Sequence, residues 1–260
     1  MAKEYDNINI LDVTVDNVSE VGIYCIKDKR SPGYDAKVDW FKTKINKGLK
    51  IKIAIDNSGK QIGFIEYIPS ELAWRPIKAD NFYFIHCIAL FVNDAKEKGI
   101  GRCLIQECES DAKENGKSGI CAMSSDGPWI ANKTLFEKNN FNVVEKLDRF
   151  ELLVKSFDMK VKNPEFIDWT KEQKKYIGWH LVYSDQCPWH EKSITDIKQA
   201  AIDNKINLTI KKLQTPKEAQ KAPSGFGTFS LIKDGKLLAD HYISKARFEN
   251  IVRQETKKMK

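Results

Sequence analysis

Two glycines stand two residues apart in the run Lys96-Glu97-Lys98-Gly99-Ile100-Gly101. Residues 82–92, before this run, have the apolar pattern of a strand, and residues 102–114, after it, have that of a helix. Glycines at a strand-to-helix turn leave backbone N–H groups uncovered beside the positive end of the helix. The pattern therefore favours binding of a phosphate or pyrophosphate group.

Two nearby side chains are suited to proton transfer. His86 lies on the predicted strand before the turn, and the usual histidine pKa suits a general base. Glu66 interrupts the apolar run Phe64-Ile65-Glu66-Tyr67 of a neighbouring strand and is the second candidate. Alternation along that strand also allows Glu66 to face solvent. His86 is equally well explained as a hydrogen-bonded histidine in the core.

A third chemical signal is Cys187, in the sequence Cys187-Pro188-Trp189-His190 before a predicted helix. A thiol at a helix N-terminus has a lowered pKa, and a charged His190 would lower it further. Cys187 is therefore a candidate reactive thiol. The alternative is a module that serves dimerisation or shapes a binding pocket. The six cysteines show no paired or metal-finger spacing, so neither a metal site nor a structural disulfide is expected.

The elements that must position these side chains alternate between helices and strands, which predicts an α/β (α+β) protein. We expect a domain over residues 1–155, a linker over 156–177 and a smaller domain over 178–260. The first domain has expected strands at 8–15, 50–56, 61–69, 82–92, 118–124, 141–146 and 150–154, and helices at 17–25, 35–48, 101–116 and 132–139. The second has strands at 179–183, 207–213, 228–232 and 237–243, and helices at 190–204 and 245–257.

Composition limits the classes of function. The chain has 260 residues, 42% hydrophobic and 30% charged, with no apolar run long enough to span a membrane and no apolar N-terminal segment. A cytoplasmic location is the expectation. Basic and acidic residues balance over 1–155, whereas 156–260 hold 20 basic and 13 acidic side chains, the whole net charge of +7. Scattered solvating lysines or an acidic partner explain this surplus; no nucleic-acid pattern accompanies it.

The order of elements over residues 5–155 resembles the GNAT acyltransferase family. Its signature, Gln/Arg-x-x-Gly-x-Gly/Ala, corresponds to Lys96-x-x-Gly99-x-Gly101, with lysine in place of the usual first residue. The run Thr134-Leu135-Phe136-Glu137-Lys138-Asn139-Asn140-Phe141 is similar to the family's Leu-Tyr-x-Lys-x-Gly-Phe ending. The resemblance implies a GNAT fold with a mixed central sheet and acetyl-CoA as co-substrate. It also implies transfer of the acetyl group to a primary amine of a small molecule or peptide, by direct attack on the thioester.

The same resemblance implies where the donor binds. The pyrophosphate would lie on N–H groups from about Lys98 to Cys103, and the pantetheine arm would pair with a splayed strand, where a bulge frees backbone groups. A backbone N–H near Leu90 to Val92 would meet the thioester carbonyl. The implied cofactor-binding residues are Ala89, Leu90, Phe91, Val92, Lys96, Lys98, Gly99, Ile100, Gly101, Arg102, Cys103, Asn132 and Phe136.

The resemblance also bears on the general acid and on the acceptor pocket. Where many family members carry a tyrosine near the coenzyme sulfur, this chain has Phe136, so Tyr83, Ser124, Ser125 or water is left to protonate the thiolate. The acceptor pocket is expected around residues 29–40 and 71–82. Its candidate lining residues are Trp40, Trp74 and Arg75, of which Arg75 would suit a carboxylate on the acceptor.

Residues 178–260 resemble the thioredoxin-like fold. Cys187 to His190 stand where that fold carries Cys-x-x-Cys, and Ala222-Pro223-Ser224 stand near its cis-proline. The combination resembles bacterial acetyltransferases with a C-terminal YoaP-like domain. Two alternatives stay open: a non-catalytic acyl-CoA-binding module, and a thiol-redox or thiol-adduct protein centred on Cys187. The sequence also leaves a homodimer open.

Overall fold

The computed structural model describes residues 8–90, 99–158 and 160–257. The chain forms two compact units, and neither is one continuous segment. The N-terminal unit consists of Met1–Lys29, Phe41–Ala73 and Ile77–Phe166. The C-terminal unit consists of Arg30–Trp40, Trp74–Pro76 and Ile167–Lys260, so it includes two short pieces of the first third of the chain.

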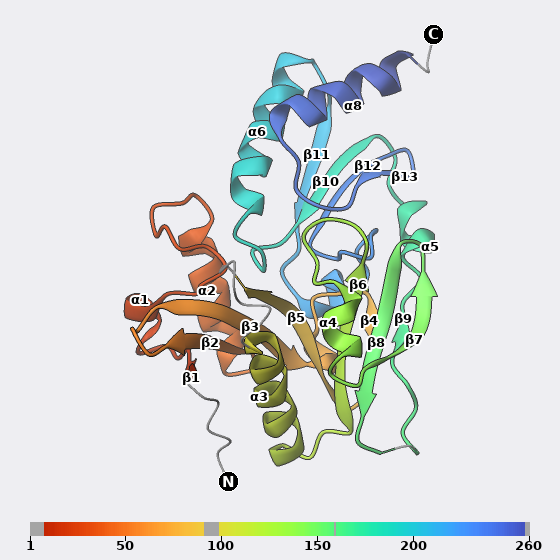
Figure 1. Ribbon diagram of the computed structural model, residues 1–260. Coiled ribbons are helices and arrows are strands. Elements are labelled where there is room, and N and C mark those ends of the chain that lie inside the picture. The colour runs from red at the N-terminus through yellow and green to blue at the C-terminus, as the bar shows by residue number, and fades with distance from the viewer. Residues whose placement is uncertain (1–7, 91–98, 159, 258–260) are drawn as a thin grey trace. The chain divides into compact units, whose positions relative to one another are not determined.

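A seven-stranded sheet forms the N-terminal unit, in the order β1-β2-β3-β5-β6-β8-β7 (Figure 1). Only β5 and β6 pair in parallel, and the other neighbours are antiparallel. The predicted class, α/β with a mixed central sheet, is confirmed. The strands are β1 (Ile8–Asp12), β2 (Lys50–Asp56), β3 (Gln61–Pro69), β5 (Phe82–Leu90), β6 (Gly119–Ser125), β7 (Asn142–Leu147) and β8 (Phe150–Ser156).

Helix α3 (Ile100–Glu114) covers one face of this sheet (Figure 1). Its apolar residues recur with helical spacing, and Leu104 and Cys108 are fully buried in the main core cluster. The remaining helices of this part of the chain are α1 (Val18–Val21), α2 (Tyr34–Ile45), whose residues 34–40 belong to the C-terminal unit, and α4 (Lys133–Glu137).

Asp111 of α3 fixes the helix to the sheet. Its carboxylate accepts hydrogen bonds from the Lys50 ammonium at 2.7 Å and from the Tyr67 hydroxyl. Burial works against ionisation of Asp111, but these bonds and the charge of Lys52 outweigh it and hold the pKa of the carboxyl below its usual value. Burial and the same carboxylate raise the pKa of Tyr67 far above its usual value. The network is therefore ionic at Asp111 and neutral at Tyr67.

The C-terminal unit holds a four-stranded sheet in the order β11-β10-β12-β13. Strand β10 (Trp179–Tyr183) pairs in parallel with β11 (Leu208–Lys212) and antiparallel with β12 (Phe229–Lys233). Strand β13 (Lys236–Ala239) completes an antiparallel hairpin with β12. Helices α6 (His190–Asp203) and α8 (Lys245–Lys257) pack against each other, and α5 (Trp169–Gln173) and α7 (Pro216–Ala219) are short (Figure 1).

Several predicted boundaries are confirmed to the residue, among them β2, β3, β10 and α8. The predicted helix over residues 17–25 is wrong beyond Val21, because Gly22 and Tyr24 both have positive φ angles. The predicted strand over 237–243 ends at Ala239. The short elements η1 (Ser70–Leu72), β4 (Ile77–Lys78), β9 (Glu165–Phe166), α5 and α7 fall where the sequence showed no periodic pattern.

Two further findings concern the chain as a whole. No peptide bond within the described residues is cis, and this includes the bond before Pro223. No helix within the described ranges combines the length and apolar character that crossing a membrane requires.

Candidate functional site

The two parallel strands of the N-terminal sheet separate halfway along their length. Residues 82–85 of β5 pair with residues 119–122 of β6, and the pairing ends there. The remainder of β5 stays paired with β3 on its other edge, and the remainder of β6 stays paired with β8. The facing edges of the two strands therefore diverge beyond Ile85 and Ala122, and leave a row of backbone groups that this ladder does not use.

A bulge lies on β5, but not at the predicted position. The register runs Glu66 opposite Cys87 and then Tyr67 opposite Ile85, so His86 is the extra residue. Ala89 and Leu90, where the bulge was expected, pair regularly with β3. The bulge was expected at Ala89, Leu90 and Phe91; the prediction is wrong at the first two of these residues, and Phe91 lies outside the described residues. The edge expected to accept the pantetheine arm arises instead where β5 and β6 diverge.

The turn before α3 adopts the geometry that its glycines suggested. Gly99 caps the helix in the left-handed conformation, with φ of 67° and ψ of 11°, which L side chains adopt only with strain. Within the described residues, a Cβ at Gly99 would meet no atom within 4 Å. The first N–H groups of α3 have no acceptor inside the helix, so this end can accept an anion.

Gly101 sets where this helix end lies. A Cβ there would stand 2.9 Å from Leu135 Cδ1 and 3.7 Å from Leu90 Cδ1. The start of α3 is therefore close to the end of β5 and to α4. The N–H groups of the helix and the diverging edge of β5 meet in one region, as an extended ligand with a phosphate group would require.

The other predicted cofactor residues fall into three groups. Phe91, Val92, Lys96 and Lys98 lie outside the described residues. Ile100 is buried in the core cluster, and Arg102 is exposed on the first turn of α3. Cys103 is buried, and burial raises the pKa of its thiol to about 11, so it is a neutral part of the core.

Asn132 and Phe136 have structural contacts. The Asn132 Oδ1 atom accepts the Thr134 N–H at 2.9 Å and caps α4. Phe136 is buried in the core with its ring edge on Phe141, and the two ring centroids are 5.3 Å apart. Neither side chain needs a ligand to explain its placement. Their neighbour Leu135 is the residue that packs against Gly101.

His86 and Glu66 form a buried pair. The His86 Nδ1 atom lies 3.1 Å from Glu66 Oε1, and the two residues are 7% and 1% exposed. The reading in which Glu66 faces solvent is therefore wrong. A carboxylate that accepts the Nδ1 proton fixes the tautomer and makes Nε2 the basic nitrogen of the ring. Both side chains lie on the sheet face opposite α3, since their neighbours Tyr67 and Ile85 belong to the core beneath that helix.

Tyr83 does not join this pair. Its ring packs edge-on against Tyr67, with centroids 5.4 Å apart, in the core beneath α3. Burial raises the pKa of Tyr83. Two other candidate donors lie on the diverging part of β6: Ser124 donates to the Ala131 carbonyl at 2.7 Å, and Ser125 accepts from Arg149 at 2.5 Å. Sequence reasoning missed Arg149.

The predicted acceptor residues belong to the C-terminal unit. Trp40 and Trp74 are both buried and meet edge to face, with ring centroids 5.4 Å apart. Arg75 is 4% exposed, donates to the Trp74 carbonyl at 2.8 Å and to Gln186 Oε1 at 3.3 Å, and lies 5.0 Å from the Phe226 ring centroid. Arg75 is therefore a buried residue whose guanidinium already donates within the protein, and its proposed contact with a carboxylate of the acceptor stays a prediction.

A second buried cation in this unit went unnoticed in the sequence. Lys37 has no exposed surface, and its ammonium lies 4.1 Å from the Trp40 ring centroid. The feature that pointed to it is the spacing of Lys37 and Trp40, three apart on one helix.

Cys187 is half-buried and stands three residues before His190, the first residue of α6. His190, 1% exposed, donates its Nδ1 proton to the Ser184 carbonyl at 3.0 Å. Burial lowers the pKa of His190 to about 4, with the charges of Arg75 and Lys37 acting in the same direction. His190 is therefore neutral near pH 7, and the expectation that its charge activates Cys187 is wrong.

Comparison with known proteins finds a family model, a relative in sequence and solved structures that match the chain. The family model described as YoaP-like matches residues 207–250. A Bacillus subtilis protein described as uncharacterized N-acetyltransferase YoaP is 28% identical over 249 residues, which cover 93% of this chain and 97% of that protein. A GNAT-family acetyltransferase from Staphylococcus aureus Mu50 covers 58% of this chain and 99% of its own, with 18% identity and a TM-score of 0.43. PaiA N-acetyltransferase from Thermoplasma acidophilum, solved with coenzyme A, covers 58% and 99%, with 15% identity and a TM-score of 0.41.

Proposed function

We propose that the chain is an acetyl-CoA-dependent N-acetyltransferase of the GNAT type that acts on a primary amine of a small molecule or peptide. The observation that carries this proposal is the divergence of β5 and β6 beyond Ile85 and Ala122, directly beside the open start of α3. The Bacillus subtilis relative, described as an N-acetyltransferase, supports it over nearly the whole chain.

The residues present fit the donor. The N–H groups that follow Gly99 would hold the pyrophosphate, and Arg102 would add positive charge. The edge of β5 that faces β6, from His86 to Leu90, would pair with the amide groups of the pantetheine arm. When bound, acetyl-CoA supplies a thioester carbonyl that an amine can attack.

We assign proton transfer to the His86–Glu66 pair. His86 would accept the proton that the acceptor amine loses as its nitrogen forms a bond to the acetyl carbon. Glu66 would hold the Nδ1 proton and stabilise the charged imidazole. As the carbon–sulfur bond breaks, the thiolate takes a proton from water or from Ser124 or Ser125. Tyr83 has no part in this scheme, because its place is in the core beneath α3.

A coenzyme A release assay over a panel of primary amines tests this function. We expect release that depends on enzyme, donor and at least one amine, and that falls in the His86→Gln variant while acetyl-CoA binding is retained. Tight acetyl-CoA binding without release for any amine would favour the non-catalytic acyl-CoA-binding module instead. Absence of both binding and release would contradict the proposal.

For the C-terminal unit we propose a thioredoxin-like architecture. Its support is the order β11-β10-β12-β13, with one parallel pair, one antiparallel hairpin and a helix after the first strand. The position of Cys187 before the 14-residue helix α6 favours a reactive thiol as the second candidate function. The rate of alkylation of Cys187 across pH tests it: a thiol pKa near that of free cysteine would contradict thiol chemistry.

A further inference from the structure

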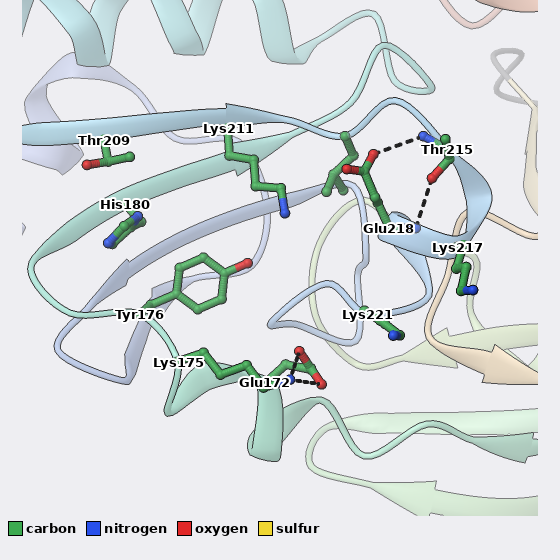
Figure 2. Close-up of a pocket in the computed structure, with 11 residues that line it drawn as sticks. Glu172, Lys175, Tyr176, His180, Thr209, Lys211, Thr215, Lys217, Glu218 and Lys221 are labelled. Atoms are coloured by element: carbon green, nitrogen blue, oxygen red, sulfur yellow. Dashed lines mark hydrogen bonds and ion pairs between the residues drawn. The ribbon is translucent and has the colours of Figure 1, made fainter.

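A groove with a volume of about 560 Å³ lies in the C-terminal unit, and none of the residues that line it was assigned a role above (Figure 2). Its floor comes from β10 and β11 through His180, Thr209 and Lys211. Tyr176 and the end of α5 form one wall, and α7 with its flanking residues forms the other. We call it the lysine groove; it is lined by Glu172, Lys175, Tyr176, His180, Thr209, Lys211, Leu213, Thr215, Lys217, Glu218 and Lys221.

The groove lies on the face of the small sheet opposite α8. Neighbouring residues of β10 point to opposite faces, and Trp179 meets Phe248 of α8, with ring centroids 6.0 Å apart. His180 therefore points to the other face, where its ring meets Tyr176 edge to face at 5.1 Å. A sheet face floored by a histidine, a threonine and a lysine is poorly suited to packing and well suited to a polar ligand.

Both carboxylates of the lysine groove already have partners. Glu172 accepts the Lys175 ammonium on both oxygens at 2.7 Å. Glu218 accepts the backbone N–H groups of Gln214 at 2.7 Å and Thr215 at 3.1 Å, in a capping box at the start of α7. Neither carboxylate therefore depends on the other lysines of the groove.

Lys211, Lys217 and Lys221 are exposed, and within the described ranges none of them forms an ion pair. The charge of Lys211 acts at longer range on Glu218, whose pKa is lowered first by the Gln214 N–H. Four lysines against two glutamates give the groove an excess of two positive charges. This excess belongs to the basic surplus of residues 156–260.

Two hydroxyl groups add neutral hydrogen-bond donors to the ammonium groups of the lysine groove. The Tyr176 hydroxyl on one wall and the Lys211 ammonium on the floor both point toward the middle of the groove (Figure 2). Burial and the nearby Glu172 raise the pKa of Tyr176, so its hydroxyl keeps its proton and can donate. Thr209 adds a second hydroxyl on the floor.

We propose that the lysine groove binds a small phosphomonoester, a site separate from the acetyl-CoA site and independent of the proposed function. A phosphate monoester carries about 1.5 to 2 negative charges at pH 7, which matches the excess charge, and its oxygens accept from ammonium and hydroxyl groups. The volume falls within the range of about 300–1,000 Å³ typical of small-molecule sites. The ring of Tyr176 offers an apolar surface to the organic part of the ligand.

The test is a titration of the full-length protein with phenyl phosphate, followed by amide shifts in two-dimensional NMR spectra. We expect shifts at Tyr176, His180 and Thr209, and binding at least fivefold weaker in the double variant Lys211→Gln/Lys221→Gln. The matched control is Lys198→Gln/Lys257→Gln, which removes two exposed charges from α6 and α8 and should bind within twofold of wild type. Phenyl sulfate, with one charge on the same shape, and inorganic phosphate, without the ring, should each bind at least threefold more weakly.

Equal weakening in the two double variants would mean a general charge effect and would overturn the proposal. If phenyl sulfate bound as tightly as phenyl phosphate, the groove would not select a doubly charged group, and the proposal would be wrong. If inorganic phosphate bound as tightly, the organic part of the ester would make no contribution, and the proposal would also be wrong. Shifts confined to residues 99–103 would place the ligand at the acetyl-CoA site. The absence of any shift would also overturn the proposal. The lysines would then be explained as charges on the edge strand β11 that prevent it from pairing with other chains.

Discussion

The two long helices that follow strands, α3 and α6, begin in opposite surroundings. Helix α3 begins after Gly99, and among the described residues nothing stands within 4 Å of a Cβ placed there. Helix α6 begins after Trp189, whose ring stacks on Tyr242 with centroids 6.3 Å apart. The first residue of α6, His190, is buried among aromatic rings.

The dipole of a helix favours an anion or thiolate at either start, so the dipole alone does not distinguish the two. What differs is the covering of the backbone. At α3 two glycines leave N–H groups open beside a diverging strand edge, whereas at α6 aromatic rings and a neutral histidine occupy the space. We infer that the start of α3, whose N–H groups are open, binds acetyl-CoA. We infer that the residues covering the start of α6 determine the reactivity of Cys187.

The largest expected effect concerns the chemistry beside the open start. His86→Gln removes the proposed base, so we expect kcat/KM for the best amine to fall about 10²- to 10⁴-fold. Acetyl-CoA affinity should stay within a few-fold, since the side chain faces away from α3. Tyr83→Phe is the matched control on the same strand and should leave the pH profile unchanged. A larger loss in Tyr83→Phe than in His86→Gln would reverse the assignment of roles.

The next largest effect concerns the covered start of helix α6. A Cβ on Gly33 would stand 1.8 Å from the Pro188 carbonyl oxygen, so Gly33→Ala must displace the loop that leads into α6. We expect a loss of about 3 kcal/mol in the free energy of unfolding, measured by denaturant titration, together with faster alkylation of Cys187. Gly59→Ala, at an open turn, should cost only about 1 kcal/mol for its positive φ and leave the alkylation rate unchanged. Unchanged alkylation in Gly33→Ala would mean that this loop does not cover the thiol.

A smaller effect concerns the anchoring of α3. Asp111→Asn removes the carboxylate that holds Lys50 and Tyr67, so we expect a loss of about 2 kcal/mol in the free energy of unfolding at pH 7. The folded-state pKa of Asp111 lies below its unfolded value, so its contribution is present above about pH 4 and is lost as the pH falls further. The difference between wild type and variant should therefore shrink below pH 4. A difference that is constant from pH 7 to pH 3 would contradict this account.

The smallest effect sharpens the account of the turn. Gly99→Ala forces an L side chain into the left-handed conformation, at a cost of about 1 kcal/mol, but adds no clash among the described residues. We expect acetyl-CoA affinity to fall about fivefold. Gly101→Ala instead pushes against Leu135 and should disturb α4 as well, seen as amide shifts at Thr134 and Phe136. Identical behaviour of the two variants would contradict the separate roles given to the two glycines.

The sequence predicted what depends on local periodicity. Strands β2 and β3 and helix α8 were correct to the residue because their apolar spacing is regular and their ends carry turn residues or charges. The sequence identified His86 and Glu66 as candidates on adjacent strands, so their pairing could be predicted. Their burial could not, because it depends on a bulge whose position is set by the register of β3 and β5.

The sequence failed where distant segments decide the outcome. Arg75 was expected to line the acceptor pocket, but it is buried and contacts Gln186 and Phe226, more than a hundred residues away in the sequence. The neutral state of His190 likewise follows from burial that no local pattern reveals. Residues 30–40 and 74–76 belong to the C-terminal unit although they are distant from the rest of it in the sequence.

The most direct test of the central claim is a two-dimensional NMR titration of the isotopically labelled protein with acetyl-CoA. The account predicts the largest amide shifts at residues 99–103 and along the edge of β5 that faces β6, from His86 to Leu90, with none of comparable size around Cys187 and His190. Shifts concentrated at the start of α6, with none at the start of α3, would contradict it.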